Sequence, residues 1–160
     1  MLKQLMIAAA LVLAVLGPGV AEDVSFSPND MGQVEFTMPS GNIGCVYTPE
    51  GGTDVYEPQD GGPELICERV EPSYVTVIVG PEGSPQVIED PGEQSCCGAT
   101  NSFTYDATLE LDGFSCDSAT TGLTCRRDDG VGFHMARAGI TLIGVDDDDD
   151  TSTDEDDEEE

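Results

Sequence analysis

The nine residues FTYDATLEL, at positions 103–111, alternate strictly between apolar and polar side chains. Successive side chains of a β-strand point to opposite faces of a sheet, so this pattern predicts one strand with a buried face and a solvated face. The buried face would carry every second residue from Phe103 to Leu111. The surrounding chain should therefore be built on β-sheet.

Other segments follow the same rule. Residues 34–38 alternate likewise, and YVTVIVG at 74–80 is apolar and β-branched enough for a central strand. Gly, Pro and Asp-Gly turns separate the segments, and apolar residues do not recur at helical spacing. We predict one all-β domain over 22–145, either a β-sandwich or a small β-barrel. The shorter expected strands are 43–47, 65–70, 86–89, 123–126, 133–137 and 140–145.

The beginning of the chain has the features of a secretory signal peptide. Lys3 precedes an apolar run at 5–17, and small residues end the segment. We expect residues 1–21 to be removed by cleavage between Ala21 and Glu22. A membrane anchor is the alternative, but the run is shorter than the roughly 20 residues that span a bilayer. The exported chain is expected to be secreted or periplasmic, with no membrane span.

Six cysteines indicate disulfide bonds, because an even number in a small exported chain is typical of an oxidising compartment. Zinc is a poor alternative, since the only histidine is His134 and the only close cysteine pair is adjacent in sequence. We expect neither a metal nor a cofactor. The six residues are Cys45, Cys67, Cys96, Cys97, Cys116 and Cys125.

The spacing of the cysteines favours particular pairs. Cys116 and Cys125 are separated by a turn-rich octet, and Cys45 and Cys67 flank a Gly/Pro-rich segment. Those two pairs would leave Cys96 and Cys97 to bond to each other. Alternatively, neighbouring side chains on a strand face opposite ways, so each of these two could reach a different partner. Six cysteines allow 15 connectivities, and the sequence does not exclude the others.

The charge of the chain is strongly negative, at −28 overall. Without the leader, four arginines would face 33 acidic residues, a net charge of −29. Residues 146–160 contain 12 of these acids and should form a disordered tail, because they have almost no apolar groups to bury. The tail could solvate the protein, bind a basic partner or associate weakly with calcium. Nucleic acid is excluded as a partner, since binding it requires Lys and Arg.

Three arginines and one histidine are candidate functional residues. Arg126, Arg127 and Arg137 could form an anion or carboxylate clamp, for which the planar guanidinium is suited. The alternative is local pairing with nearby aspartates, which stabilises little at a surface. His134 could act in a hydrolase with Asp128 or Asp129 as its partner, or be an ordinary surface residue. The DDG sequence at 128–130 is better explained as a turn than as a calcium site.

Several motifs resemble a family of exported bacterial proteins that is known only as a domain of unknown function. They lie in segments 36–52, 64–75, 95–105 and 113–140, and include SGNIGC, GLTC and a G-x-G-F pattern. The resemblance implies a secreted β-rich domain without an established activity. The family pattern ends in G-H-G-F and a Ser-Arg pair, whereas Val131 and Ala136 stand at the His and Ser positions here.

These features predict a non-catalytic binding or structural domain that acts on an unknown partner in the cell envelope or outside the cell. A small secreted hydrolase around His134 is the first alternative, and a deep pocket holding that residue beside a carboxylate would favour it. An inhibitor of a secreted enzyme is the second. For that role, the Gly/Pro-rich segment 48–64 would have to form an ordered, protruding loop.

Overall fold

The computed structural model describes residues 21–93 and 97–145. These residues form eleven β-strands and no helix, which confirms the predicted all-β class. None of the described residues forms a helix long and apolar enough to cross a membrane. The strands are β1 (Glu22–Val24), β2 (Val34–Thr37), β3 (Ile43–Thr48), β4 (Glu64–Arg69), β5 (Val75–Val79), β6 (Gln86–Glu89), β7 (Ala107–Leu111), β8 (Phe114–Ala119), β9 (Gly122–Arg127), β10 (Gly132–Ala136) and β11 (Gly139–Ile143).

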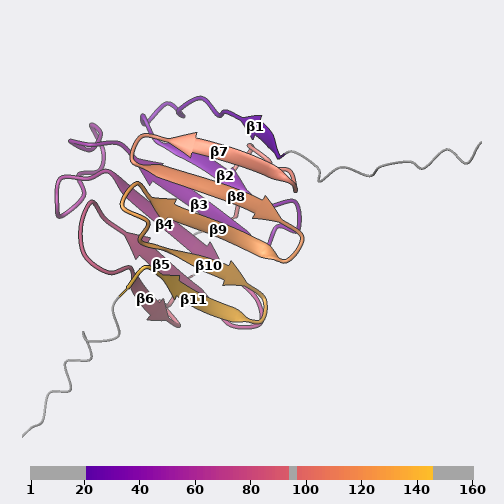
Figure 1. The fold of residues 1–160 in the computed structure, drawn as a ribbon. Helices are drawn as coiled ribbons and strands as arrows, with labels where there is room; N and C mark the ends of the chain where they lie inside the picture. The colour runs from indigo at the N-terminus through magenta and orange to yellow at the C-terminus, as the bar shows by residue number, and fades with distance from the viewer. Residues whose placement is uncertain (1–20, 94–96, 146–160) are drawn as a thin grey trace, which may run out of the picture.

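The strands form two sheets that lie face to face as two layers (Figure 1). One sheet has the order β2-β3-β4-β5-β6, and the other has the order β1-β7-β8-β9-β10-β11. The five-stranded sheet is a simple antiparallel meander, in which consecutive strands are neighbours and only the β3–β4 connection is long. Strand β1 pairs parallel with β7 and extends the second sheet at its edge. The fold is therefore a β-sandwich rather than a barrel.

One apolar core fills the space between the sheets. Alternate residues of every central strand point inward, so that Phe36, Leu65, Val77, Leu109 and Phe133 are almost completely buried. A cluster of aromatic rings closes one part of this core. Its members are Phe26, Phe36 and Phe103, with ring centroids 5.3 to 6.2 Å apart.

The segment 103–111 does not form the single strand that its alternation predicts. Asp106 has a φ of 62°, in the left-handed region, and this breaks the extended backbone ahead of β7. Phe103 is still buried, but its backbone N–H donates to the carbonyl of Thr37 in the other sheet. The prediction of a continuous strand from 103 is wrong because a local turn redirects the chain between the two layers.

Two of the predicted disulfides are present. Cys45 lies directly opposite Cys67 on β3 and β4, and Cys116 lies directly opposite Cys125 on β8 and β9. Each bond therefore joins neighbouring strands within one sheet, and neither joins the two sheets. Cys97 is also disulfide-bonded. Its sequence neighbour Cys96 lies outside the described residues, and the vicinal bond stays a prediction.

Candidate functional site

The outer face of the five-stranded sheet carries a row of aliphatic side chains. Strand register places Val46, Ile66 and Ile78 side by side on β3, β4 and β5, with Glu35 at one end of the row and Gln86 at the other. The three aliphatic residues are half-buried, although they point away from the core. This row forms the floor of two cavities, and we call the surface that surrounds both of them the acidic face.

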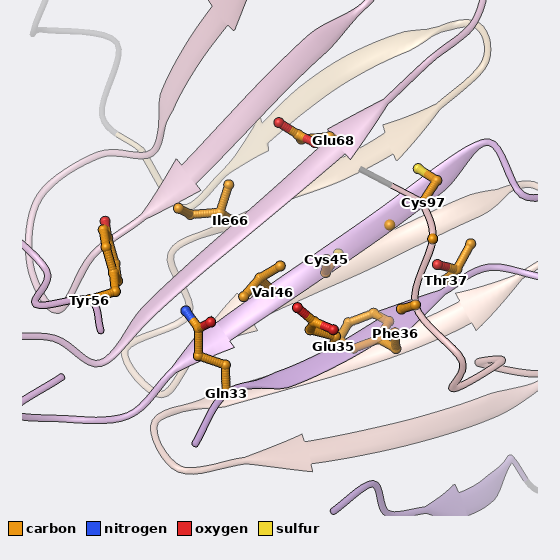
Figure 2. Close-up of a pocket in the computed structure, with 13 residues that line it drawn as sticks. Gln33, Glu35, Phe36, Thr37, Cys45, Val46, Tyr56, Ile66, Glu68 and Cys97 are labelled. Carbon is orange, nitrogen blue, oxygen red and sulfur yellow. The ribbon is translucent and has the colours of Figure 1, made fainter. Parts of the chain in front are cut away.

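The first cavity, of about 370 Å³, lies over β2, β3 and β4. Figure 2 shows Val46 and Ile66 next to each other on its floor, with Tyr56 at one end and Cys97 at the other. Glu35 and Glu68 lie on opposite sides of this floor. The cavity therefore combines an apolar base with carboxylates at its rim.

The second cavity, of about 350 Å³, continues the acidic face over β4, β5 and β6. Tyr56 lines both cavities and separates them. Its hydroxyl donates a hydrogen bond of 2.7 Å to Oε1 of Glu64, and this bond raises the pKa of Tyr56 to about 12. Burial of the phenol and the charge of Glu64 act in the same direction. The carboxylates that line the second cavity are Glu57, Asp60, Glu64 and Glu82.

Residues 97–99 form one wall of the first cavity. They pass so close to β3 that a Cβ atom on Gly44 would lie 3.1 Å from Sγ and 3.2 Å from Cα of Cys97. Glycine at this position therefore allows the segment to approach the sheet. Thr37 lies beside the same segment, and its Oγ1 is buried without a hydrogen-bond partner among the described residues.

The three candidate arginines do not form one clamp. Arg126 and Arg127 are neighbours on β9, so their side chains point to opposite faces of the sheet. Arg126 is exposed, and Arg137 forms only a loose pair with Glu71, at 3.6 Å with both side chains mostly exposed. The described structure thus places the three side chains of the predicted anion site in three different surroundings.

Arg127 has a structural role instead. Its guanidinium donates to the carbonyls of Gly80 and Gly83 in the other sheet's β5–β6 connection, at 2.9 and 3.1 Å. It also forms a bidentate pair with Asp129, and hydrogen bonding from Arg127 is the main reason why the pKa of Asp129 is lowered. Residues 128–130 form the turn between β9 and β10, as expected. Arg69 mirrors this role, since its Nη1 donates to the carbonyl of Ala136 at 2.7 Å.

His134 lies on the outer face of the other sheet, on β10. Its Nδ1 is 2.9 Å from Oγ1 of Thr124 on the neighbouring strand β9. Within the described chain, His134 lines neither cavity of the acidic face, and Asp128 and Asp129 lie in the turn beyond the strand. The structure brings His134 together with a threonine and not with these predicted acidic partners.

The Gly/Pro-rich segment between β3 and β4 is an ordered loop at residues 49–63. It is held by backbone hydrogen bonds, including Gly51 N–H to the carbonyl of Gly61 and Thr53 N–H to the carbonyl of Tyr56, both at 2.7 Å. Val55 is 63 % exposed. The loop thus presents an apolar side chain on a constrained backbone.

Comparisons of the chain with protein-family models, with curated proteins and with solved structures found no match. The resemblance to an exported bacterial family therefore stays a prediction from the motifs. The signal peptide, apart from its last residue, and the acidic tail at 146–160 lie outside the described residues.

Sequence reasoning missed the acidic face, although the alternation of β3, β4 and β5 already assigns Val46, Ile66 and Ile78 to the face opposite the core.

Proposed function

We propose that this chain is an exported, non-catalytic binding domain that holds its ligand on the acidic face. The row of Val46, Ile66 and Ile78 is the observation that carries the proposal. An antiparallel sheet that packs one face on the core usually has a polar, solvated opposite face, so a row of three aliphatic side chains there is unusual. A concave surface with an apolar floor and a few convergent polar groups is the common form of a ligand site.

Export is supported by the two disulfides in the described core, because such bonds persist in oxidising compartments. A binding role rather than a catalytic one is supported by the position of His134. It lies on the opposite side of the sandwich from the acidic face, and its Nδ1 is engaged by Thr124. The two cavities of the acidic face provide a concave, negatively charged surface on which a ligand can bind.

The test is a titration of the exported, ¹⁵N-labelled protein with four probes: a basic peptide, a neutral peptide, an acidic peptide and a neutral oligosaccharide. We expect at least one probe to shift the amide signals of Val46, Ile66 and Ile78 and to leave those of Thr124 and His134 in place. Ile66→Gln should weaken that binding. The matched control is Ile143→Gln, a half-buried position on the outer face of the other sheet. If no probe shifts the acidic face, the proposal is overturned.

A second candidate function is inhibition of a secreted enzyme by the β3–β4 loop. The internal hydrogen bonds of the loop and the exposed side chain of Val55 favour it, because a rigid loop loses little entropy on binding. Assays of secreted proteases with the protein and with Val55→Asp would test this function. Inhibition that the substitution does not weaken would rule out the loop as its cause.

A further inference from the structure

We infer, on the basis of the proposed function, that the ligand of the acidic face is a basic, amphipathic peptide segment in extended conformation. The segment would cross the strands of the five-stranded sheet. Its aliphatic side chains would lie on the floor, and its Lys or Arg side chains would reach the carboxylates at the rim.

The charge of the residues that line the two cavities indicates that the ligand is basic. Six carboxylates line the two cavities, and among the described lining residues there is no lysine, arginine or histidine. The four arginines lie elsewhere: Arg69 and Arg127 are buried at the core, Arg126 lies on the other sheet, and Arg137 pairs with Glu71. A concave surface of one sign concentrates ligands of the opposite sign. The six residues are Glu35, Glu57, Asp60, Glu64, Glu68 and Glu82.

The aliphatic floor of the two cavities indicates that the ligand also has apolar groups. A cation without apolar groups would leave Val46, Ile66 and Ile78 in contact with water, whereas a ligand with aliphatic side chains would be stabilised by burying them. Among the described residues there is no group of three acidic, histidine or cysteine side chains that could hold a metal ion. The ligand therefore needs apolar and cationic groups at short, repeated intervals, as a peptide of alternating sequence has.

The length of the row on the cavity floor indicates that the ligand is an extended segment of about six residues. From Glu35 on β2 to Gln86 on β6 the row crosses five strands, which corresponds to about 19 Å at the usual spacing of about 4.8 Å. An extended chain covers that distance in about six residues. Tyr56 stands between the two cavities, so a linear ligand would pass beside its ring.

Thr37 is an independent indication that one end of the site can hydrogen-bond a ligand. Only 8 % of this residue is exposed, its Oγ1 has no partner among the described residues, and it lines the first cavity beside residues 97–99. Buried hydroxyl groups in proteins are nearly always hydrogen-bonded. The end of a peptide that enters this cavity brings backbone N–H and C=O groups, either of which can pair with a hydroxyl.

The experiment compares three peptides of equal length with the exported protein, by calorimetry and ¹⁵N NMR at low salt. The basic peptide is acetyl-Lys-Val-Lys-Val-Lys-Val-amide; in the other two, Ser or Glu replaces Lys. We expect the basic peptide to bind at least tenfold more tightly than the Ser peptide, and the Glu peptide not to bind. Binding should shift the amide signals of Val46, Ile66, Ile78 and Thr37 and weaken as salt is added.

Two double variants separate the acidic face from general attraction to a negative protein. Glu57→Gln with Asp60→Asn removes two exposed charges from the second cavity. Glu110→Gln with Asp117→Asn removes two exposed charges from the outer face of the other sheet. We expect the first pair to raise the Kd about fivefold and the second to leave it nearly unchanged. Both proteins keep the acidic tail, so its contribution cancels.

The outcomes separate this inference from the proposed function. Equal effects of the two pairs would assign the binding to net charge or to the tail and overturn the inference. The inference would also be overturned if the Ser peptide bound as tightly as the basic peptide. Displacement of the basic peptide by spermine at the same concentration would overturn it too. If the Ser peptide or a neutral oligosaccharide shifts the acidic face and the basic peptide does not, the proposed function stands and the inference fails. If no probe shifts the amide signals of the acidic face, both the inference and the proposed function fail.

Discussion

Tyr56 donates a hydrogen bond of 2.7 Å to Oε1 of Glu64, eight residues further along the chain. The bond ties the β3–β4 loop to the first residue of β4, which is itself only 8 % exposed. It also fixes the position of the phenol ring between the two cavities of the acidic face. The position of this ring therefore depends in part on one neutral donor and one carboxylate acceptor.

The titration of Tyr56 tests this relationship. A raised pKa means that the folded state favours the neutral phenol, so the stabilisation is complete below pH 10 and is lost as the pH rises through about 12. Glu64→Gln keeps an acceptor but removes the charge, so we expect the pKa of Tyr56 to move back toward 10. Absorbance at 295 nm during an alkaline titration measures the change.

Tyr56→Phe provides the control, because the difference between its titration and that of the unmodified protein isolates the Tyr56 signal from the other tyrosines. Tyr47 also has a raised pKa, mainly through burial, and should titrate late in every variant. An unchanged Tyr56 midpoint in Glu64→Gln would show that the carboxylate charge does not stabilise the neutral phenol.

Arg127 should contribute strongly to stability, although it was predicted as a functional residue. Arg127→Lys keeps the charge but cannot reach Gly80, Gly83 and Asp129 together, so we expect a loss of about 2–3 kcal/mol in the free energy of unfolding. Arg126→Lys, at the exposed neighbouring position, should change it by less than about 0.5 kcal/mol. Urea unfolding measures both, and equal effects would contradict the cross-sheet role.

The contrast between these two arginines shows how far sequence reasoning carries. Alternation within a strand was sufficient to place Arg126 and Arg127 on opposite faces, yet proximity in sequence suggested a cluster. Most expected strands are present because their apolar side chains alternate. Strands β1 and β8 were missed. In the case of β1, three residues paired to β7 across more than eighty positions leave no local pattern.

The acidic face illustrates a different limit. The sequence assigns Val46, Ile66 and Ile78 to outward positions, but a row across three strands exists only in one register of pairing. That register is set by the turns and by the facing pair Cys45 and Cys67. The cavity walls come from the 49–63 loop and from residues 97–99, whose paths no periodicity predicts.

Gly44 should be required for the wall of the first cavity. Gly44→Ala places a methyl group 3.1–3.2 Å from three atoms of Cys97, so residues 97–99 must shift away from the sheet. We expect a net loss of about 1 kcal/mol in the free energy of unfolding, because overpacking exceeds the gain from replacing glycine. Gly98→Ala is the control, since its Cβ meets open space. Thermal unfolding measures both, and an equal response would show that the contact is not restrictive.

The pairing of Cys97 can be settled by peptide mapping without reduction. We expect Cys45 to be recovered with Cys67, and Cys116 with Cys125, since each pair lies directly opposite on neighbouring strands. Elimination then predicts that Cys96 and Cys97 bond to each other. Their peptide should carry the mass of an internal disulfide. A fragment that joins Cys97 to any cysteine other than Cys96 would exclude the vicinal bond.

Charge repulsion within the folded domain should make its stability depend on salt. Residues 22–145 contain 21 acidic residues and four arginines, and six of the acids line one face. As sodium chloride rises from 0.01 to 0.1 M, the Debye length falls from about 30 to about 10 Å, so we expect the Tm of the chain without residues 146–160 to rise. At 0.01 M salt, Glu57→Gln with Asp60→Asn should raise the Tm more than Glu110→Gln with Asp117→Asn. The reason is that Glu110 and Asp117 already accept hydrogen bonds from Ser115 and Thr108. A Tm that stays flat or falls with salt would show that repulsion does not limit the stability of the domain.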